Sequence, residues 1–266
     1  MSYSARISTR LAIAIIVILY GACAHAQHSW PRNPPHRDAY GAIIRGDTSS
    51  KQLALVFTGG DHGESTAPIL DALKSRNIKA AFFVTGGYLR QAELRPQLRR
   101  MLDDGHYLGP HSDSHPLYCD WQDREKSLVT EEFFAADLRK NLADVRALGA
   151  LPPGTPVFFI PPYEWYNRDQ AAWCRKLDVR LVNFTPGSGS NRDYAPEGDP
   201  AFVPSQTIYD DILAHERADP HGLNGFLLLL HLGSGRTDPF HTQLGPLCDE
   251  LARRGYQFAR VDELLE

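Results

Sequence analysis

Two histidines four residues apart are the first sign of chemistry in the sequence. His111 and His115 stand in the segment Gly-Pro-His-Ser-Asp-Ser-His-Pro, directly after a short apolar stretch. Imidazoles at this spacing lie on one side of a helical turn, so that both nitrogens can reach one ion. Imidazole suits zinc, nickel or cobalt better than magnesium or calcium. The pair therefore predicts a divalent metal site, with zinc as first choice, although a chain with 11 histidines also contains such pairs by chance.

A glycine-rich loop after the apolar residues 53–58 holds a second group of polar side chains. Asp61, His62 and Glu64 stand among glycines, just before an expected helix. A carboxylate beside a bound ion can act as a further ligand or as the base that takes a proton from water. The competing interpretation is an ordinary turn, in which Glu64 complements the positive end of the helix dipole.

His231 follows the apolar run of residues 226–230. The unperturbed pKa of histidine lies near neutrality, which makes His231 a candidate proton donor. A lone histidine beside an apolar run is also compatible with a purely structural role. Its expected position at the end of a strand favours the catalytic interpretation.

Residues 161–167 read Pro-Pro-Tyr-Glu-Trp-Tyr-Asn and combine aromatic with polar side chains. Proteins often grip sugars in this way, because flat rings meet the CH groups of the sugar and polar atoms meet its hydroxyls. Tyr163, Glu164 and Trp165 are therefore candidate substrate-binding residues, together with Asn183 at the end of the next apolar stretch. Core packing is the alternative for some of these rings.

Seven apolar stretches alternate with helical patterns along the chain. Because these stretches are nearly continuous, they are typical of strands buried on both faces of a parallel sheet. The alternation predicts an α/β fold, either a parallel barrel or a doubly wound sheet. In both, functional residues gather at the carboxyl ends of the strands, where the polar residues above should converge. The expected strands are residues 53–58, 80–85, 107–109, 157–160, 179–184, 226–232 and 257–261, and the expected helices are 65–77, 91–104, 130–148, 168–177, 207–218 and 242–254.

The composition narrows the classes of function. The chain has 266 residues, 42% of them hydrophobic, and a formal net charge of −4, which fits one large domain. No run of basic residues indicates a nucleic-acid partner. The sequence also contains no dinucleotide-binding glycine motif after a strand, no P-loop and no serine-hydrolase elbow.

The N-terminus is interpreted as a targeting segment. Arg6 and Arg10 precede the apolar residues 11–19, and Ala-His-Ala at 24–26 resembles a signal-peptide cleavage site. The apolar run is short for a stable membrane span. We therefore expect a signal peptide at 1–26, an extended leader at 27–50 and a catalytic domain at 51–266, exported to the periplasm or the extracellular space. Lipidation at Cys23 is the competing interpretation.

Taken in order, these motifs resemble the NodB-like polysaccharide deacetylases, carbohydrate esterase family 4, over residues 53–265. His111-Ser-Asp-Ser-His115 is similar to the family's His-Ser/Thr-x-x-His motif, and residues 227–231 to its Leu-x-x-x-His motif. Pro161-Pro-Tyr163 is similar to its Arg-Pro-Pro-Tyr motif, with isoleucine in place of arginine. The resemblance implies a distorted (β/α)7-type barrel, His111 and His115 as metal ligands and His231 as the acid.

The first motif departs from the family. Its Thr-Phe-Asp-Asp-Gly supplies a catalytic base and then a metal ligand, but residues 56–60 here read Val-Phe-Thr-Gly-Gly. The chain therefore resembles a divergent branch that lacks the usual Asp-Asp pair. We infer that Asp61, two residues beyond the lost ligand position, serves as third ligand or base; His62 is the alternative.

Three functions follow from these residues. The first is a metal-dependent deacetylase that acts on an acetylated oligo- or polysaccharide. The second is a glycoside hydrolase on the same scaffold, with its two carboxylates drawn from Asp61, Glu64, Asp113 and Glu164. The third is a glycan-binding module without catalytic activity. The sequence leaves all three open.

Overall fold

The computed structural model describes Met1 and residues 35–266. Apart from Met1, the predicted signal peptide lies outside the described residues, and so does the first part of the predicted leader. None of the helices in the described part of the chain is long and apolar enough to cross a membrane.

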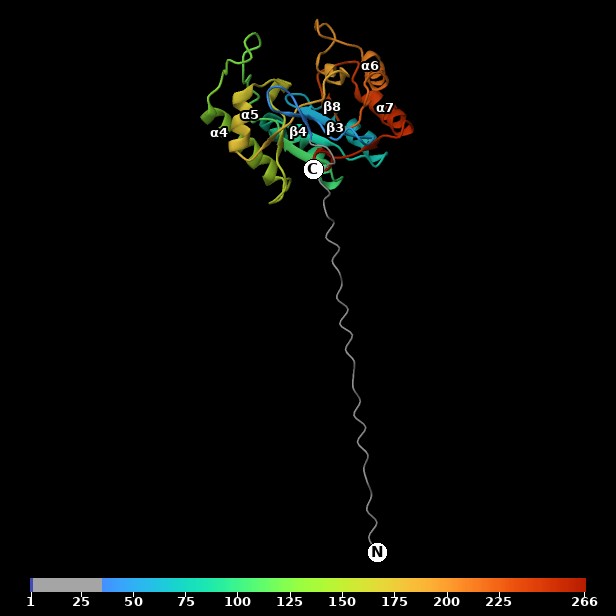
Figure 1. The fold of residues 1–266 in the computed structure, drawn as a ribbon, viewed down its shortest axis with the longest axis horizontal. Helices are drawn as coiled ribbons and strands as arrows, with labels where there is room; N and C mark the ends of the chain where they lie inside the picture. The colour runs from blue at the N-terminus through green and yellow to red at the C-terminus, as the bar shows by residue number, and fades with distance from the viewer. Residues whose placement is uncertain (2–34) are drawn as a thin grey trace.

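A parallel sheet forms the centre of the fold (Figure 1). β3 (Gln52–Gly59) lies between β8 (Phe226–His231) and β4 (Ala81–Val84), and β5 (Tyr107–Pro110) follows β4. These four strands run parallel, and the short β9 (Gln257–Phe258) also pairs with β3. All residues of β3 after Gln52 are buried, as expected for a strand covered on both faces.

The sheet continues beyond β8 through two antiparallel strands. β2 (Ile43–Arg45) pairs with β8, and β1 (His36–Arg37) pairs with β2. Arg45 fixes this edge by an ion pair of 3.1 Å with Asp219. Residues that sequence analysis assigns to the leader thus form the edge of the sheet, while the proposed domain boundary at residue 51 stays a prediction.

A second, two-stranded sheet faces the first and gives the fold its barrel-like shape. β6 (Phe158–Phe159) and β7 (Arg180–Leu181) pair in parallel, and a parallel bridge joins Val182 to Ile43 of β2. β5 and β6 approach each other, but they belong to different sheets. The result is a curled, incompletely closed α/β barrel, and the predicted distorted barrel is confirmed.

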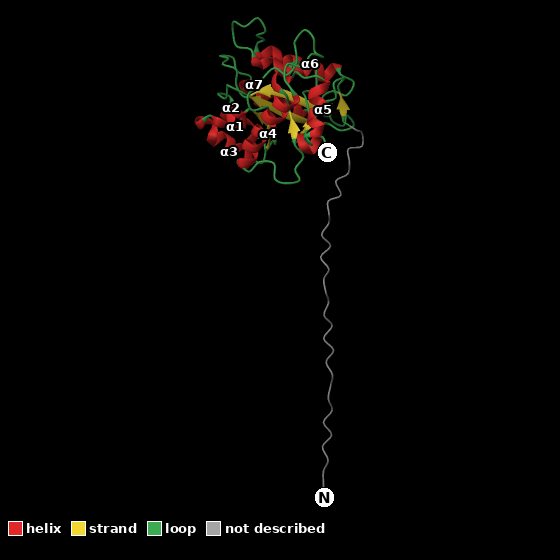
Figure 2. Ribbon diagram, turned by 90° about the vertical axis from the view of Figure 1, so that its left-hand side faces the viewer, coloured by secondary structure: helices red, strands yellow, loops and turns green. Residues whose placement is uncertain are grey.

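Helices surround the sheet (Figure 2), and Figure 1 shows α4 and α5 on one side of it and α6 and α7 on the other. Local sequence explains several boundaries: the Thr130 side chain accepts from the backbone of Phe133 at the start of α4, and Asn167 with Gln170 forms a capping box on α5. The helices are α1 (Thr66–Lys74), α2 (Gly86–Arg90), α3 (Arg95–Asp103), α4 (Glu131–Ala147), α5 (Arg168–Lys176), α6 (Ser205–Ala218), α7 (His241–Arg253) and α8 (Val261–Leu264).

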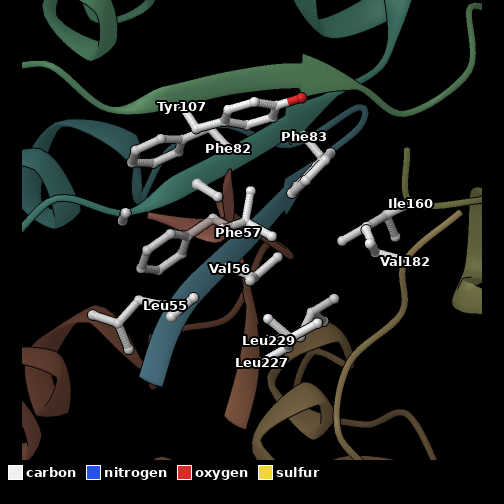
Figure 3. Close-up of a cluster of buried hydrophobic side chains, with 14 of the residues drawn as sticks. Leu55, Val56, Phe57, Phe82, Phe83, Tyr107, Ile160, Val182, Leu227 and Leu229 are labelled. Carbon is white, nitrogen blue, oxygen red and sulfur yellow. The ribbon is translucent and has the colours of Figure 1, made fainter. Parts of the chain in front are cut away.

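The barrel interior is filled by side chains from both sheets. Figure 3 shows Val56 and Leu229 on the side of the main sheet that faces Ile160 and Val182, the residues that directly follow β6 and β7. All four side chains are buried. This packing holds the carboxyl ends of β3, β5 and β8 in fixed positions, and the polar residues identified in the sequence follow these ends.

Candidate active site

A pocket of about 800 Å³ lies at the carboxyl ends of the strands. Its walls come from the ends of β3, β4, β5 and β8 and from the loops that follow them, as is usual for parallel α/β folds. The side chains that matter for chemistry are Thr58, Asp61, His62, His111, His115, Tyr163, Glu164 and His231.

His111 is buried and held in one orientation. Its backbone N–H donates to the Asn141 side-chain oxygen at 2.8 Å, and its Nδ1 lies 2.7 Å from the Ile160 carbonyl oxygen. A carbonyl only accepts, so Nδ1 carries the proton and Nε2 keeps its lone pair. Burial, assisted by the nearby His115, lowers the pKa of His111 well below its ordinary value, so the ring is neutral. Metal-binding histidines are commonly oriented in this way.

His115 lies beside His111, with ring centroids 5.1 Å apart, and both rings line the pocket. The prediction that their spacing forms a helical turn is wrong. The segment is an irregular loop in which Ser112 (φ 74°) and His115 (φ 53°) adopt the left-handed region. Non-glycine residues in this region cost free energy, and such strain often marks functional sites.

Asp137 of α4 holds this loop in shape. Its carboxylate accepts from the Ser112 hydroxyl (2.6 Å), the Asp113 N–H (3.0 Å), and both the N–H and the hydroxyl of Ser114 (3.0 and 2.6 Å). The carboxylate thereby positions His115, whose N–H donates to the Ser112 hydroxyl oxygen at 3.0 Å. Asp137 was not identified from the sequence, because it stands within an ordinary helical pattern.

His231 forms a dyad with the buried Asp193. Asp193 Oδ1 lies 2.6 Å from His231 Nδ1, and Oδ2 accepts the His231 backbone N–H at 2.9 Å. Burial acts to lower the pKa of His231, but the Asp193 charge and hydrogen bond outweigh it and raise the pKa above its ordinary value. This arrangement suits a proton donor near neutral pH. Asp193 belongs to a short 3₁₀ turn and was not identified from the sequence.

Asp61 lines the same pocket, but its side chain is exposed to solvent. Burial lowers the pKa of His115, and the Asp61 charge opposes that shift, so the two groups interact electrostatically. Nevertheless, Met1 and residues 35–266 contain no group of three or more His, Cys, Asp or Glu side chains arranged to hold a metal ion. The pocket therefore brings Asp61 near the two imidazoles without forming a closed three-ligand site.

Two other acidic residues of the first two motifs, Glu64 and Asp113, bind other groups of the protein. Glu64 Oε1 accepts the backbone N–H groups of Ser234 and Gly235 at 2.8 and 2.6 Å, which fixes the loop after β8. Asp113 forms ion pairs with Arg90 and Lys140. Of the four carboxylates considered for glycosidic cleavage, Asp61 and Glu164 therefore line the pocket, whereas Glu64 and Asp113 do not.

A side chain at Gly59, the family's second aspartate position, would have to displace its neighbours. A Cβ at Gly59 would lie 2.8 Å from Leu232 Cδ1 and 3.0 Å from the Tyr88 ring. At the first aspartate position, the Thr58 side chain is buried and lines the pocket, and its hydroxyl has no hydrogen-bond partner among the described residues. A hydroxyl and apolar side chains thus stand where the family has two carboxylates.

The predicted sugar-binding residues separate into two groups. Tyr163 and Glu164 line the main pocket, and both adopt the left-handed region (φ 59° and 53°). Burial raises the pKa of the Glu164 carboxyl to about 7, with the Asp193 charge adding to the shift and His231 opposing it. Trp165 and Asn183 instead line an adjoining side pocket of about 280 Å³, which also includes Tyr163 and Glu164.

Two aromatic residues that sequence analysis missed also line the main pocket. Trp121 and Tyr194 are about half exposed, at 56% and 48%. The Trp121 ring packs 5.8 Å from Tyr163, and the Tyr194 ring lies 6.1 Å from His231. Exposed rings at a pocket rim are suited to contact with a sugar face.

The protein is an α/β barrel. His111, His115 and the His231–Asp193 dyad, groups of the kind that hydrolases use, lie at the carboxyl ends of its strands. Residues 45–182, just over half of the chain, match the sequence profile described as polysaccharide deacetylase. The chain therefore belongs to this family, the NodB-like carbohydrate esterase family 4, and the resemblance noted from the sequence is confirmed.

Individual relatives agree with this assignment. Peptidoglycan-N-acetylglucosamine deacetylase PgdA of Listeria monocytogenes is 42% identical over 217 residues, which cover 81% of this chain and 39% of that protein. The chain spans about half the length, or less, of the curated relatives that it matches first.

Solved structures share the fold. PdaA of Bacillus subtilis, a family 4 carbohydrate esterase, superposes with a TM-score of 0.66 at 23% identity, covering 85% of both chains. A CE4 family pseudoenzyme from Bacillus anthracis superposes with a TM-score of 0.64 at 18% identity, covering 86% of this chain and 70% of that one. The fold thus occurs both in esterases and in a protein described as a pseudoenzyme.

Proposed function

We propose that the protein removes acetyl groups from an oligo- or polysaccharide by metal-assisted hydrolysis. The observation that carries this proposal is the convergence of His111, His115 and the His231–Asp193 dyad on one pocket. Membership in the polysaccharide deacetylase family supports the reaction type, and the exposed aromatic rings at the rim support a glycan substrate.

His111 and His115 fit a divalent ion with a preference for nitrogen ligands, such as zinc, nickel or cobalt. The tautomer imposed by the Ile160 carbonyl leaves Nε2 of His111 unprotonated, as a ligand requires. Asp61, which lines the same pocket and interacts electrostatically with His115, is the candidate for either a third protein ligand or the base. A bound ion would supply Lewis-acid polarisation of the acetyl carbonyl and a lower pKa for water.

The chain's own residues account for the proton transfers. Asp61 takes a proton from the attacking water, and protonated His231 gives a proton to the nitrogen or oxygen that leaves the acetyl carbon. Asp193 keeps His231 oriented through Nδ1 and favours its charged form, which leaves Nε2 as the atom that donates. The reaction consumes water and yields acetate and the free amine or alcohol of the sugar.

A glycan-binding module without turnover is the second candidate. Thr58 and Gly59 replace the family's two aspartates, and one structural neighbour is described as a pseudoenzyme. This candidate predicts binding of the same sugars with no acetate release. The glycoside hydrolase alternative would rest on Asp61 and Glu164, which line the pocket, because Glu64 and Asp113 are engaged in other contacts. Membership in the polysaccharide deacetylase family favours deacetylation over this alternative.

We further propose that the protein acts outside the cytoplasm, because residues 1–26 have the pattern of a signal peptide. Sequencing the N-terminus of the exported protein tests this proposal.

Acetate release and reducing-end release, measured on a panel of acetylated glycans with and without a chelator, separate the three functions. The proposed function predicts chelator-sensitive acetate release. New reducing ends without acetate would indicate glycosidic cleavage, and binding without either product would indicate a binding module.

A further inference from the structure

The side pocket that adjoins the candidate active site contains a fixed guanidinium group. Arg124 Nε donates to the Tyr166 carbonyl oxygen at 2.7 Å. The guanidinium carbon lies 3.8 Å from the centre of the Tyr40 ring and 3.9 Å from that of Trp165. These contacts immobilise the group before any ligand arrives.

No carboxylate forms an ion pair with Arg124 within residues 35–266, and the contacts of Arg124 found there use Nε and the faces of the guanidinium. Among these residues, no group hydrogen-bonds to its two terminal NH₂ groups, so a ligand can reach them. Arg168, which stacks on the same Tyr40 ring, instead pairs with Glu125 at 2.7 Å. An arginine that is rigid, half-buried and unpaired is prepared for a planar anion, because its parallel N–H groups match a carboxylate.

The side pocket continues the main pocket, since Tyr163, Glu164 and Asn191 line both. Its volume of about 280 Å³ suits a single sugar ring. A glycan that places its acetylated unit in the main pocket can therefore place a neighbouring unit here.

We propose that the side pocket binds a sugar unit that bears a carboxylate, such as a uronic acid, with the carboxylate held by Arg124. The identification of this unit as the neighbour of an acetylated sugar rests on the proposed function. The side pocket would then make the protein selective for acidic, acetylated glycans.

The acidic side chains of the side pocket do not oppose this ligand strongly. Asp38 Oδ1 accepts three backbone N–H groups, from residues 40–42, at 2.8 to 3.0 Å. Asp38 Oδ2 accepts the Tyr166 hydroxyl at 2.6 Å, so both oxygens are turned to the protein. Burial raises the pKa of Glu164 to about 7, which weakens its charge near neutral pH.

The test is a nuclear magnetic resonance titration of the protein labelled with ¹⁵N in its arginine side chains. The probes are the methyl glycosides of glucuronate and galacturonate and the methyl esters of both acids. We expect at least one uronate to shift the Arg124 Nε–H resonance in a saturable way. Its ester, which lacks the charge, should bind at least about tenfold more weakly.

Arg124→Lys keeps the positive charge but removes the paired N–H groups, and it should weaken uronate binding about tenfold or more. Arg168→Lys changes the other guanidinium on Tyr40 and should leave the affinity unchanged. If Arg124→Lys fails to fold, the affinities of the wild-type protein for the acid and for its ester still test the proposal.

The proposal is overturned if neither uronate shifts the resonance, if acid and ester bind equally, or if both variants lose affinity alike. The titration involves no turnover. Acetate release without uronate binding would therefore refute the side-pocket proposal alone, and uronate binding without acetate release would refute the proposed function alone.

Discussion

Asp193→Asn tests the proton-donor role of His231 with the smallest change in shape. Asparagine can keep one hydrogen bond to the histidine, but it removes the negative charge that lies 2.6 Å from Nδ1. Both side chains are well shielded from water, with exposed fractions of 4% for Asp193 and 18% for His231. The charged hydrogen bond is therefore not greatly weakened by solvent.

A hydrogen bond to a charged group contributes about 1.5–3 kcal/mol. If that contribution stabilises protonated His231 in the transition state, its loss lowers kcat about 10- to 100-fold. The sign of the pH effect follows from the raised pKa of His231. The protonated acid persists to higher pH in the wild type, so the alkaline limb of the activity profile should move to lower pH in the variant.

Acetate release measured across pH gives both quantities. Asp211→Asn is the matched control. Asp211 lies on α6 and pairs with Arg192, which belongs to the same 3₁₀ segment as Asp193, and it does not bond to His231. The assignment of His231 as the acid is wrong if Asp193→Asn keeps the wild-type kcat and the same alkaline limb. Equal losses in both variants would point to damage to the segment instead.

Three further substitutions test other parts of the site. Asp61→Asn should lower acetate release about 10²- to 10⁴-fold. Its free energy of unfolding in urea should change by less than about 0.5 kcal/mol, because the side chain is exposed. Full activity would mean that another group is the base. Asp137→Ala removes four hydrogen bonds from the His111–His115 loop and should cost about 2–4 kcal/mol in the same unfolding assay, and an unchanged midpoint would contradict its positioning role. Gly59→Asp should destabilise the protein by about 1–3 kcal/mol and add no metal affinity, because Leu232 and Tyr88 fill the space; a stable variant with tighter metal binding would show that the space can open.

The strands of the main sheet could be predicted well because they are buried on both faces. The apolar stretches at 53–58 and 226–232 correspond to β3 and β8 within one residue at each end. The stretches at 157–160 and 179–184 contain strands of only two residues each, β6 and β7. These two strands pair with each other in a separate sheet, and the barrel is therefore incompletely closed. The short α2 was missed, since it begins with two glycines.

The site could be predicted where its residues follow strands and not where it depends on tertiary contacts. His111 and His231 come at the ends of apolar stretches, His115 follows His111 by four residues, and all three line the pocket. Asp193 and Asp137 lie 38 and 22–26 residues from the histidines they position, and no local pattern marks them. The left-handed backbone of His115 was not predicted either, because only a few per cent of non-glycine residues adopt that conformation, although histidine is enriched among them.

The metal content of the purified protein tests the central claim most directly. After dialysis against zinc and removal of free metal, the wild type should retain a stoichiometric ion by mass spectrometry, and His115→Ala should retain none. His241→Ala is the control, because that histidine contacts the Ser65 hydroxyl outside the pocket and should keep the ion. Equal zinc in all three proteins, or none in the wild type, would contradict the proposal that His111 and His115 hold a catalytic metal.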